Sequence, residues 1–312
     1  MGYVFGPVPS RRLGLSLGVD LIPPKTCTFD CLYCQVGRTT LKTVKPQVFA
    51  PAGEVLDEMK RKLPGVSPDV ITLAGSGEPT LHSEIGSIIS SIRGMTGTDI
   101  VVLTNGSLLW RKDVAQKVLK AHIVMPTLTS AFDETFQKIH RPHPDLKLDV
   151  VIRGLKDFRQ EFEGQFLLEV VLLKGINDSE REFEGLKKTA DGISPDRIQL
   201  NTVVRPPSDS TAIALDRKRL EDIKMLFGKR ADIVAEASVE GKRGKEKNLA
   251  SDFLAMVKRR PLSTVDAAHS LGLSLEEVED LVKGLMIKGF ISSREHSGET
   301  YYVSKDENDG GQ

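Results

Sequence analysis

The chain has 312 residues, long enough for one large domain and a second, smaller one. Lysine and arginine together number 43, as do aspartate and glutamate, so the balanced charge excludes a global field that attracts nucleic acid or anionic membranes. No apolar run approaches the roughly 18–20 residues of a membrane-spanning helix, and the N-terminus does not resemble a secretory signal. We therefore expect a cytoplasmic protein with no membrane partner.

Apolar runs of strand length alternate with amphipathic stretches over the first two thirds of the chain. Strands are predicted at Ser16–Ile22, Val70–Ala74, Asp99–Thr104, His122–Thr129, Gln165–Leu173 and Arg197–Val204. Helices are predicted at Ala52–Leu63, Glu84–Arg93, Lys112–Lys120, Asp149–Glu161, Glu180–Ala190 and Ala212–Phe227. This alternation predicts an α/β fold with a parallel sheet. A closed eight-unit barrel takes about 250 residues, so the shorter segment Ser16–Gly228 favours an open, six-unit (β/α) partial TIM-type barrel.

Three cysteines, Cys27, Cys31 and Cys34, follow the first predicted strand and are the only cysteines in the chain. Three thiolates on one short loop can hold three irons of a [4Fe–4S] cluster, which normally takes four cysteine ligands. Structural zinc is the alternative, but its fourth ligand would have to come from elsewhere, because the nearest histidine is His82. The odd cysteine count and the reducing compartment disfavour a disulfide.

Glycine-rich or polar segments follow the other predicted strands, and the chemistry of such barrels collects at these strand ends. The segments are Ala74–Thr80, Thr104–Gly106, Lys174–Asp178 and Leu200–Pro207. Glycines let backbone groups approach a ligand closely. Taken alone, each segment could equally be a turn or a set of internal hydrogen bonds instead of a binding site.

A second module follows the barrel. We expect the barrel domain to span residues 1–236, a linker 237–247, the module 248–305 and a polar tail 306–312. Within the module, Leu249–Arg260 is a predicted helix, capping patterns at Ser263–Asp266 and Ser274–Glu277 open two more helices, and His296–Glu299 is the turn between two short strands. Three helices and a hairpin predict a small α+β domain like a winged helix-turn-helix.

From the cysteine loop onward, the chain resembles the radical S-adenosylmethionine (SAM) enzymes. Gly75–Pro79 is similar to the Gly-Gly-Glu-Pro motif of that family, with Ser76 inserted. The segments Gly6–Gly14, Asp20–Cys27 and Gln199–Pro207 resemble a group related to the tRNA wyosine-base synthases. The resemblance implies one [4Fe–4S] cluster whose open iron binds SAM. An electron from an external low-potential donor then splits SAM into methionine and a 5′-deoxyadenosyl radical, which abstracts hydrogen from an unidentified substrate.

The same resemblance assigns roles to residues of this chain. It implies that the three cysteines bind the cluster, and that SAM is bound by residues at and after the strand ends. The candidates for SAM binding are Tyr33, Gly75, Gly77, Glu78, Thr104, Asn105, Thr127, Thr129, Glu169 and Asn201. Arginine is suited to bidentate recognition of carboxylate or phosphate, so polar clusters outside the predicted elements supply candidates for the substrate. These candidates are Arg11, Arg12, His140, Arg141 and Arg205.

Differences from the family patterns reduce the number of reactions that this chain could catalyse. The chain has no cysteines for a second cluster, as in wyosine synthases, or for the catalytic pair of dual-cysteine RNA methylases. Glycyl-radical activating enzymes carry Asp-Leu-Lys where this chain has Pro126–Thr129. We expect an enzyme with a single cluster.

The C-terminal module suggests a macromolecular partner. Its predicted recognition helix, Ser274–Lys288, carries four acidic residues and two lysines, whereas a DNA-reading helix directs basic residues toward phosphates. A protein partner or a macromolecular substrate is therefore favoured over DNA. The alternative function is an iron–sulfur sensor of redox state or SAM that binds DNA through this module.

Overall fold

A curved, eight-stranded sheet forms the larger part of the molecule. The computed structural model describes residues 2–234 and 249–305, so the predicted linker and tail lie outside the described residues. The sheet order is β1 (Val4–Ser10), β2 (Gly14–Val19), β5 (Val70–Leu73), β6 (Asp99–Thr104), β7 (Ile123–Pro126), β8 (Gln165–Val171), β9 (Arg197–Asn201) and β10 (Ala231–Ile233). β1 is antiparallel to β2 and every later pair is parallel.

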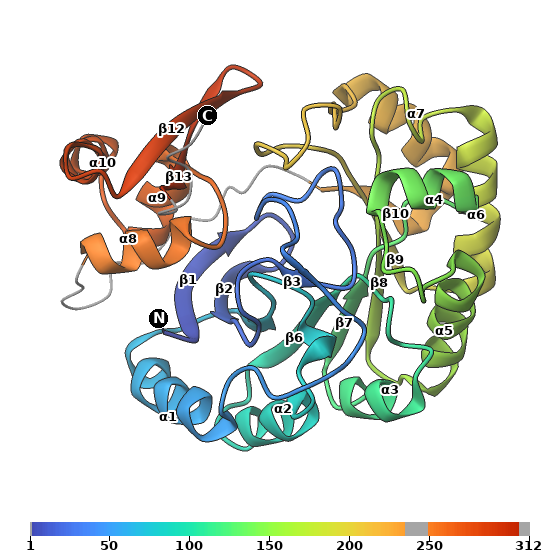
Figure 1. Cartoon of the computed structure of the whole chain (residues 1–312), viewed down its shortest axis with the longest axis horizontal. Helices are drawn as coiled ribbons and strands as arrows, with labels where there is room; N and C mark the ends of the chain where they lie inside the picture. Colours follow the sequence, from blue (N-terminus) through green and yellow to red (C-terminus); the bar gives the residue numbers. More distant parts are fainter. Residues whose placement is uncertain (1, 235–248, 306–312) are drawn as a thin grey trace.

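Helices surround the outside of the sheet (Figure 1). They are α1 (Ala52–Lys62), α2 (Ile85–Arg93), α3 (Lys112–Val118), α4 (Asp133–His140), α5 (Leu148–Glu161), α6 (Glu180–Ile193) and α7 (Arg217–Phe227). All residues of β5 and β7 are buried, as expected for parallel strands covered by helices. The six predicted strands are neighbours in chain order, and β1 and β10 lie at the two ends of the sheet. The predicted open partial barrel is thus confirmed.

The larger part also contains strands and a helix that were not predicted, namely β1, β10, the two-residue strands β3 (Thr26–Cys27) and β4 (Leu41–Lys42), and α4. The prediction that the polar clusters lie outside regular elements was therefore wrong in part, since Ser10 ends β1 and His140 ends α4. Helix α4 and strand β1 end at these two residues, and the arginines that come next lie in the loops that follow. The shorter bounds of β7 place Thr127 and Thr129 beyond the strand.

The C-terminal module, residues 249–305, contains α8 (Leu249–Val257), β11 (Leu262–Ser263), α9 (Thr264–Leu271), α10 (Leu275–Ile287), β12 (Ile291–His296) and β13 (Glu299–Ser304). Its three-stranded sheet has the order β11-β13-β12. Ser263 caps α9, and Ser274 forms a capping box with Glu277 at the start of α10. These elements are compatible with the predicted winged helix-turn-helix.

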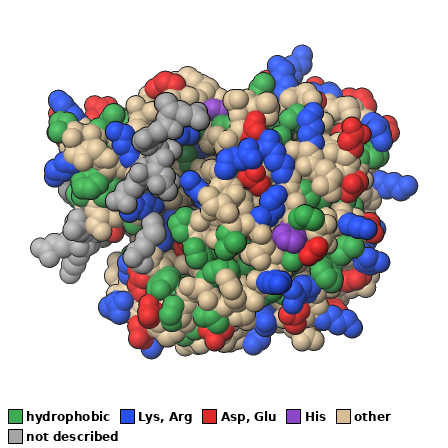
Figure 2. Space-filling model, viewed as in Figure 1, with side chains coloured by type: hydrophobic (Ala, Val, Ile, Leu, Met, Phe, Trp, Pro, Cys, Tyr) green, Lys and Arg blue, Asp and Glu red, His purple; other side chains and the backbone are tan. Residues whose placement is uncertain are grey.

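The C-terminal module packs beside β1 (Figure 1). Val8 of β1 belongs to the apolar core of the module, and Phe5 packs against that core. Within the described ranges, no helix is long and apolar enough to cross a lipid bilayer. Figure 2 shows basic and acidic side chains interspersed over one face of the molecule, in keeping with the balanced charge.

Candidate functional site

The three cysteines lie at the rim of one cavity. Cys27 ends the short strand β3 (Thr26–Cys27), which pairs with β4 (Leu41–Lys42), and Thr26 forms a bridge to Gly77. Cys27, Cys31 and Cys34 all line a cavity of about 380 Å³ between the carboxyl ends of the parallel strands and the C-terminal module. All three thiols are free.

Most of the predicted site residues line this same cavity. The lining SAM candidates are Tyr33, Gly75, Gly77, Glu78, Thr104, Asn105, Thr127, Glu169 and Asn201, and the lining substrate candidates are Arg11, Arg12 and Arg205. Thr129, His140 and Arg141 do not line it. The strand-end segments therefore converge as parallel strands of a barrel require, although they come from distant parts of the sequence.

Thr129 and His140 lie behind the cysteine loop. His140 is buried, its Nδ1 atom lies 3.1 Å from Cys31 Sγ, and its Nε2 atom lies 2.7 Å from the Thr129 hydroxyl oxygen. Burial lowers the pKa of His140 to about 3, so the imidazole is neutral. The Asp30 N–H donates to the His140 carbonyl over 2.8 Å. His140 supports the loop from the end of α4, and Thr129 contacts His140 instead of lining the cavity.

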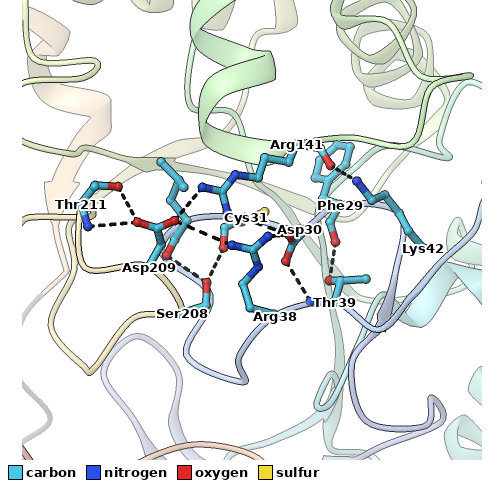
Figure 3. Close-up of polar contacts among 11 residues, drawn as sticks. Phe29, Asp30, Cys31, Arg38, Thr39, Lys42, Arg141, Ser208, Asp209 and Thr211 are labelled. Atoms are coloured by element: carbon cyan, nitrogen blue, oxygen red, sulfur yellow. Dashed lines mark hydrogen bonds and ion pairs between the residues drawn. The ribbon is translucent and has the colours of Figure 1, made fainter. Parts of the chain in front are cut away.

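Arg141 lies in a charged cluster on the outer side of the loop, shown in Figure 3. Its Nη2 atom donates to Asp209 Oδ2 over 2.6 Å, and Arg38 Nη2 lies 2.9 Å from Asp30 Oδ2. The Asp209 N–H donates to the Leu32 carbonyl over 3.1 Å. The cluster therefore joins the cysteine loop to α4 and to the loop that follows β9.

Asp209→Asn is expected to loosen the cysteine loop. Hydrogen bonds from the Thr211 hydroxyl and from Arg141 lower the pKa of Asp209 to about 2. The carboxylate is thus fully present above its ordinary pKa and is lost only as the pH falls toward 2. With the charge removed, we expect a protein reconstituted with iron and sulfide to lose iron to a chelator about twofold to tenfold faster. The exposed residue Asp57 provides the matched control Asp57→Asn, and equal rates in all three proteins would contradict the role.

The segment Gly75–Pro79 surrounds a buried carboxylate, that of Glu78. Glu78 Oε1 accepts from the Thr80 hydroxyl and from the Thr104 hydroxyl, both over 2.6 Å. Gly77 is required by close packing, because a Cβ atom there would lie 1.9 Å from the Thr26 carbonyl oxygen. Glu78 therefore holds the ends of β5 and β6 together, and its oxygens already have protein partners.

Asn105 connects Glu78 to the cysteines. Its N–H donates to Glu78 Oε2 over 2.7 Å, and its Nδ2 atom donates to the Thr28 hydroxyl over 2.7 Å. The same Nδ2 atom lies 3.6 Å from Cys27 Sγ, within hydrogen-bond distance of a sulfur acceptor. Asn105 is thus placed to donate to a thiolate ligand and to fix its orientation.

A second polar group occupies the opposite wall, on β8 and β9. Glu169 Oε1 accepts from Asn201 Nδ2 over 2.9 Å and forms an ion pair with Arg12, while Glu169 Oε2 accepts from the Thr127 hydroxyl over 3.1 Å. Arg11 Nη1 lies 3.5 Å from Asn201 Oδ1. This wall offers amide, hydroxyl and carboxylate groups to a polar ligand.

The segment after β5 is also joined to the C-terminal module, which sequence analysis did not predict. Ser76 donates its hydroxyl to Asp20 Oδ2 over 2.6 Å, and Arg259 Nε donates to the same oxygen over 2.9 Å. Arg259 and Arg260 line the cavity from the end of the module's first helix. No local pattern identifies them, because they are some 240 residues away from Asp20 in sequence.

The donor set fits an iron–sulfur cluster better than a single metal ion. Among the described residues, no three His, Cys, Asp or Glu side chains are placed to hold one ion, as structural zinc requires. In a cluster, each thiolate binds a different iron. Backbone N–H groups of Thr28 and Phe29 donate to the sulfur of Cys27, and those of Val36 and Gly37 donate to the sulfur of Cys34. Such donors favour the anionic sulfur.

Burial, in contrast, disfavours the anionic form of the three thiols. It raises the pKa of Cys27 to about 12, and it also raises the pKa values of Cys31 and Cys34. The only ring nitrogen within hydrogen-bond distance of these thiols in the described chain belongs to neutral His140. Three thiolates therefore require a bound cationic group, and the cavity provides space beside them.

Comparisons with known proteins agree with this geometry. The model of the "Radical SAM superfamily" matches residues 21–184. A UPF0026 protein of Methanocaldococcus jannaschii is 32% identical over 322 residues, covering 99% of each chain. A protein named GTPase Obg from Brachyspira hyodysenteriae is 37% identical over 289 residues, covering 91% of this chain, but this chain spans only 42% of that relative's length.

The fold also matches a solved structure. A radical SAM methyltransferase from Sphaerobacter thermophilus has a TM-score of 0.51 and 19% identity, covering 70% of this chain and 65% of that one. At this identity the likeness shows the fold alone.

Proposed function

Because this chain belongs to the radical SAM superfamily, whose cofactors are a [4Fe–4S] cluster and SAM, we propose that it is an enzyme that removes a hydrogen atom from its substrate. Cys27, Cys31 and Cys34 would hold the cluster. The observation that carries this proposal is that the chain's only three cysteines line one cavity with the strand-end motifs.

When bound together, the cluster and SAM supply a 5′-deoxyadenosyl radical that abstracts hydrogen. The protein's own groups would position these cofactors. Asn105 donates toward Cys27, and His140 lies against Cys31 from the protein side. Glu78 orients Asn105 through its backbone N–H. Tyr33 lines the cavity, and burial raises the pKa of its hydroxyl, which therefore stays protonated.

The opposite wall is proposed to hold the polar groups of SAM. Thr127, Glu169 and Asn201 form one hydrogen-bonded group there. Acceptors and donors in a fixed arrangement suit the hydroxyl and amino groups of a nucleoside. Thr129 is not part of this proposed group, because it does not line the cavity and its hydroxyl contacts His140.

The test is SAM cleavage under anaerobic conditions. The protein is reconstituted with iron and sulfide, supplied with a low-potential reductant and SAM, and assayed for 5′-deoxyadenosine by mass spectrometry. Formation above a control without reductant supports the proposal. Retention of zinc in place of iron contradicts it. A loaded cluster that yields no deoxyadenosine, with or without cell extract as a source of substrate, supports the sensor function instead.

A protein partner is proposed for the C-terminal module. Helix α10 presents acidic Glu276, Glu277, Glu279 and Asp280 against Lys283, which opposes contact with DNA phosphates. In mobility-shift assays at low salt, we expect no retardation of genomic DNA fragments, with or without the cluster. Retardation that depends on the cluster would favour the DNA-binding sensor.

A further inference from the structure

Five arginines line the same cavity as the cysteines. They come from three separate segments: the turn between β1 and β2, the loop after β9, and the residues that follow α8. These arginines are Arg11, Arg12, Arg205, Arg259 and Arg260. The overall charge of the chain is balanced, so this gathering of positive charge is local.

Three of the five have carboxylate partners. Arg12 pairs with Glu169, Arg205 with Asp266 over 2.8 Å, and Arg259 with Asp20 over 2.9 Å. Each of these charges would be costly to bury without its partner. These pairs neutralise three of the five positive charges, so two positive charges are left without a carboxylate partner.

Arg11 and Arg260 are the remaining two. Neither forms an ion pair within the described part of the chain. Arg11 has one long contact, 3.5 Å to Asn201 Oδ1, and Arg260 Nη2 lies 3.4 Å from the Pro9 carbonyl oxygen. In addition, the buried Nε atoms of Arg205 and Arg260 have no hydrogen-bond partner. The donors of buried guanidinium groups normally have acceptors. This site therefore has hydrogen-bond donors and positive charge that no described residue pairs with.

Electrostatics agrees with this geometry. Burial and the nearby guanidinium of Arg205 lower the pKa of Arg260 to about 9 and the pKa of Arg11 to about 10. These arginines therefore repel one another while remaining charged at neutral pH. An anion between them would relieve that repulsion.

We propose that Arg11, Arg205 and Arg260 bind a phosphate group of the substrate in this cavity. Two unpaired positive charges match a phosphate monoester, which carries about −1.5 to −2 charge at pH 7. Three guanidinium groups, one from each of three segments, match the number of its free oxygens, whereas a carboxylate offers two. The substrate role rests on the proposed function, but phosphate binding itself does not.

This site gives the C-terminal module a part in substrate recognition. Arg260 comes from the module, and Asp266 on α9 orients Arg205. The module therefore completes the phosphate site instead of merely adjoining the barrel. The substrate is placed with its phosphate on the arginines and its reacting carbon toward the cysteines.

The test measures binding of inorganic pyrophosphate to the full-length, cluster-loaded protein by isothermal titration calorimetry, with saturating SAM. Arg260→Gln is expected to weaken binding about tenfold or more, since it removes a charged hydrogen-bond donor. Arg11→Gln is the second variant and should act similarly. Arg217→Gln, which removes an exposed arginine on α7, is the matched control and should leave the affinity unchanged.

Each result decides the proposal. Equal affinities in the wild-type and Arg260→Gln proteins would overturn it. Succinate binding as tightly as pyrophosphate would also overturn it, because that result would indicate a carboxylate site. Competition between SAM and pyrophosphate would overturn it too, because that result would assign the arginines to SAM binding. Because the binding assay needs no turnover, absence of deoxyadenosine would count against the proposed function and leave this result standing.

Discussion

Cys31→Ala is expected to abolish retention of the iron–sulfur cluster, and with it all SAM cleavage. Cys31 supplies one of the only three thiols in the chain, all of which line the cavity, so its removal leaves a second iron without a protein ligand. Changes to residues that merely support a ligand cost about 10- to 100-fold in metal affinity, and loss of the ligand itself should cost more. Iron and sulfide content after anaerobic reconstitution, and the yield of 5′-deoxyadenosine, measure the two effects.

A matched control is available at a residue that contacts the same cysteine loop. Ser208 donates its hydroxyl to the Cys31 carbonyl over 2.8 Å without supplying a ligand. Ser208→Ala should therefore keep its cluster and most of its cleavage activity. Circular dichroism should show that both variants are folded. A Cys31→Ala protein with the wild-type iron content would refute the cluster assignment.

Arg259→Met is expected to destabilise the protein by about 3–5 kcal/mol, the range for removing one partner of a buried ion pair. The side chains of Arg259 and Asp20 are 4% and 7% exposed, respectively. Arg259 also donates to the Gly2 and Ala255 carbonyls and lies 4.5 Å from the centre of the Phe5 ring. Methionine retains part of the apolar packing but leaves the Asp20 carboxylate buried without its cation.

The free energy of unfolding, from urea titrations followed by circular dichroism, measures this effect. Arg294→Met, an exposed site on β12 of the same module, should change it by less than about 0.5 kcal/mol. Adding Asp20→Asn to Arg259→Met should recover part of the loss, because the orphaned charge disappears. A loss below about 1 kcal/mol in the single variant would show that the ion pair does not hold the module to the barrel.

The regular part of the barrel could be predicted from sequence because each central strand is an apolar run followed by a distinct turn. β6 has the predicted bounds, Asp99–Thr104. β1 was missed because Gly6, Pro7 and Pro9 hide its strand pattern, and because it is an antiparallel edge strand outside the strand–helix repeat. α4 was also missed.

The site was predictable to the extent that strand ends determine it. Glu169 and Asn201 meet because β8 and β9 are paired neighbours. His140 and Thr129 were assigned to ligands because residue type alone does not show which way a side chain points beyond a strand end. Arg260 was not assigned at all, since its contact with the cavity depends on how two modules pack, which no local pattern encodes.

The position of the C-terminal module beside β1 has a consequence for solubility. β1 ends the described sheet, and an uncovered edge strand offers unpaired backbone groups to any other chain. Here α8 and α9 pack against that strand, and Phe5 and Val8 turn their apolar surface into the module. A barrel produced without the module would expose both the edge and this apolar surface, so it should aggregate during expression. The module thus protects the barrel from self-association in addition to any part it takes in recognition.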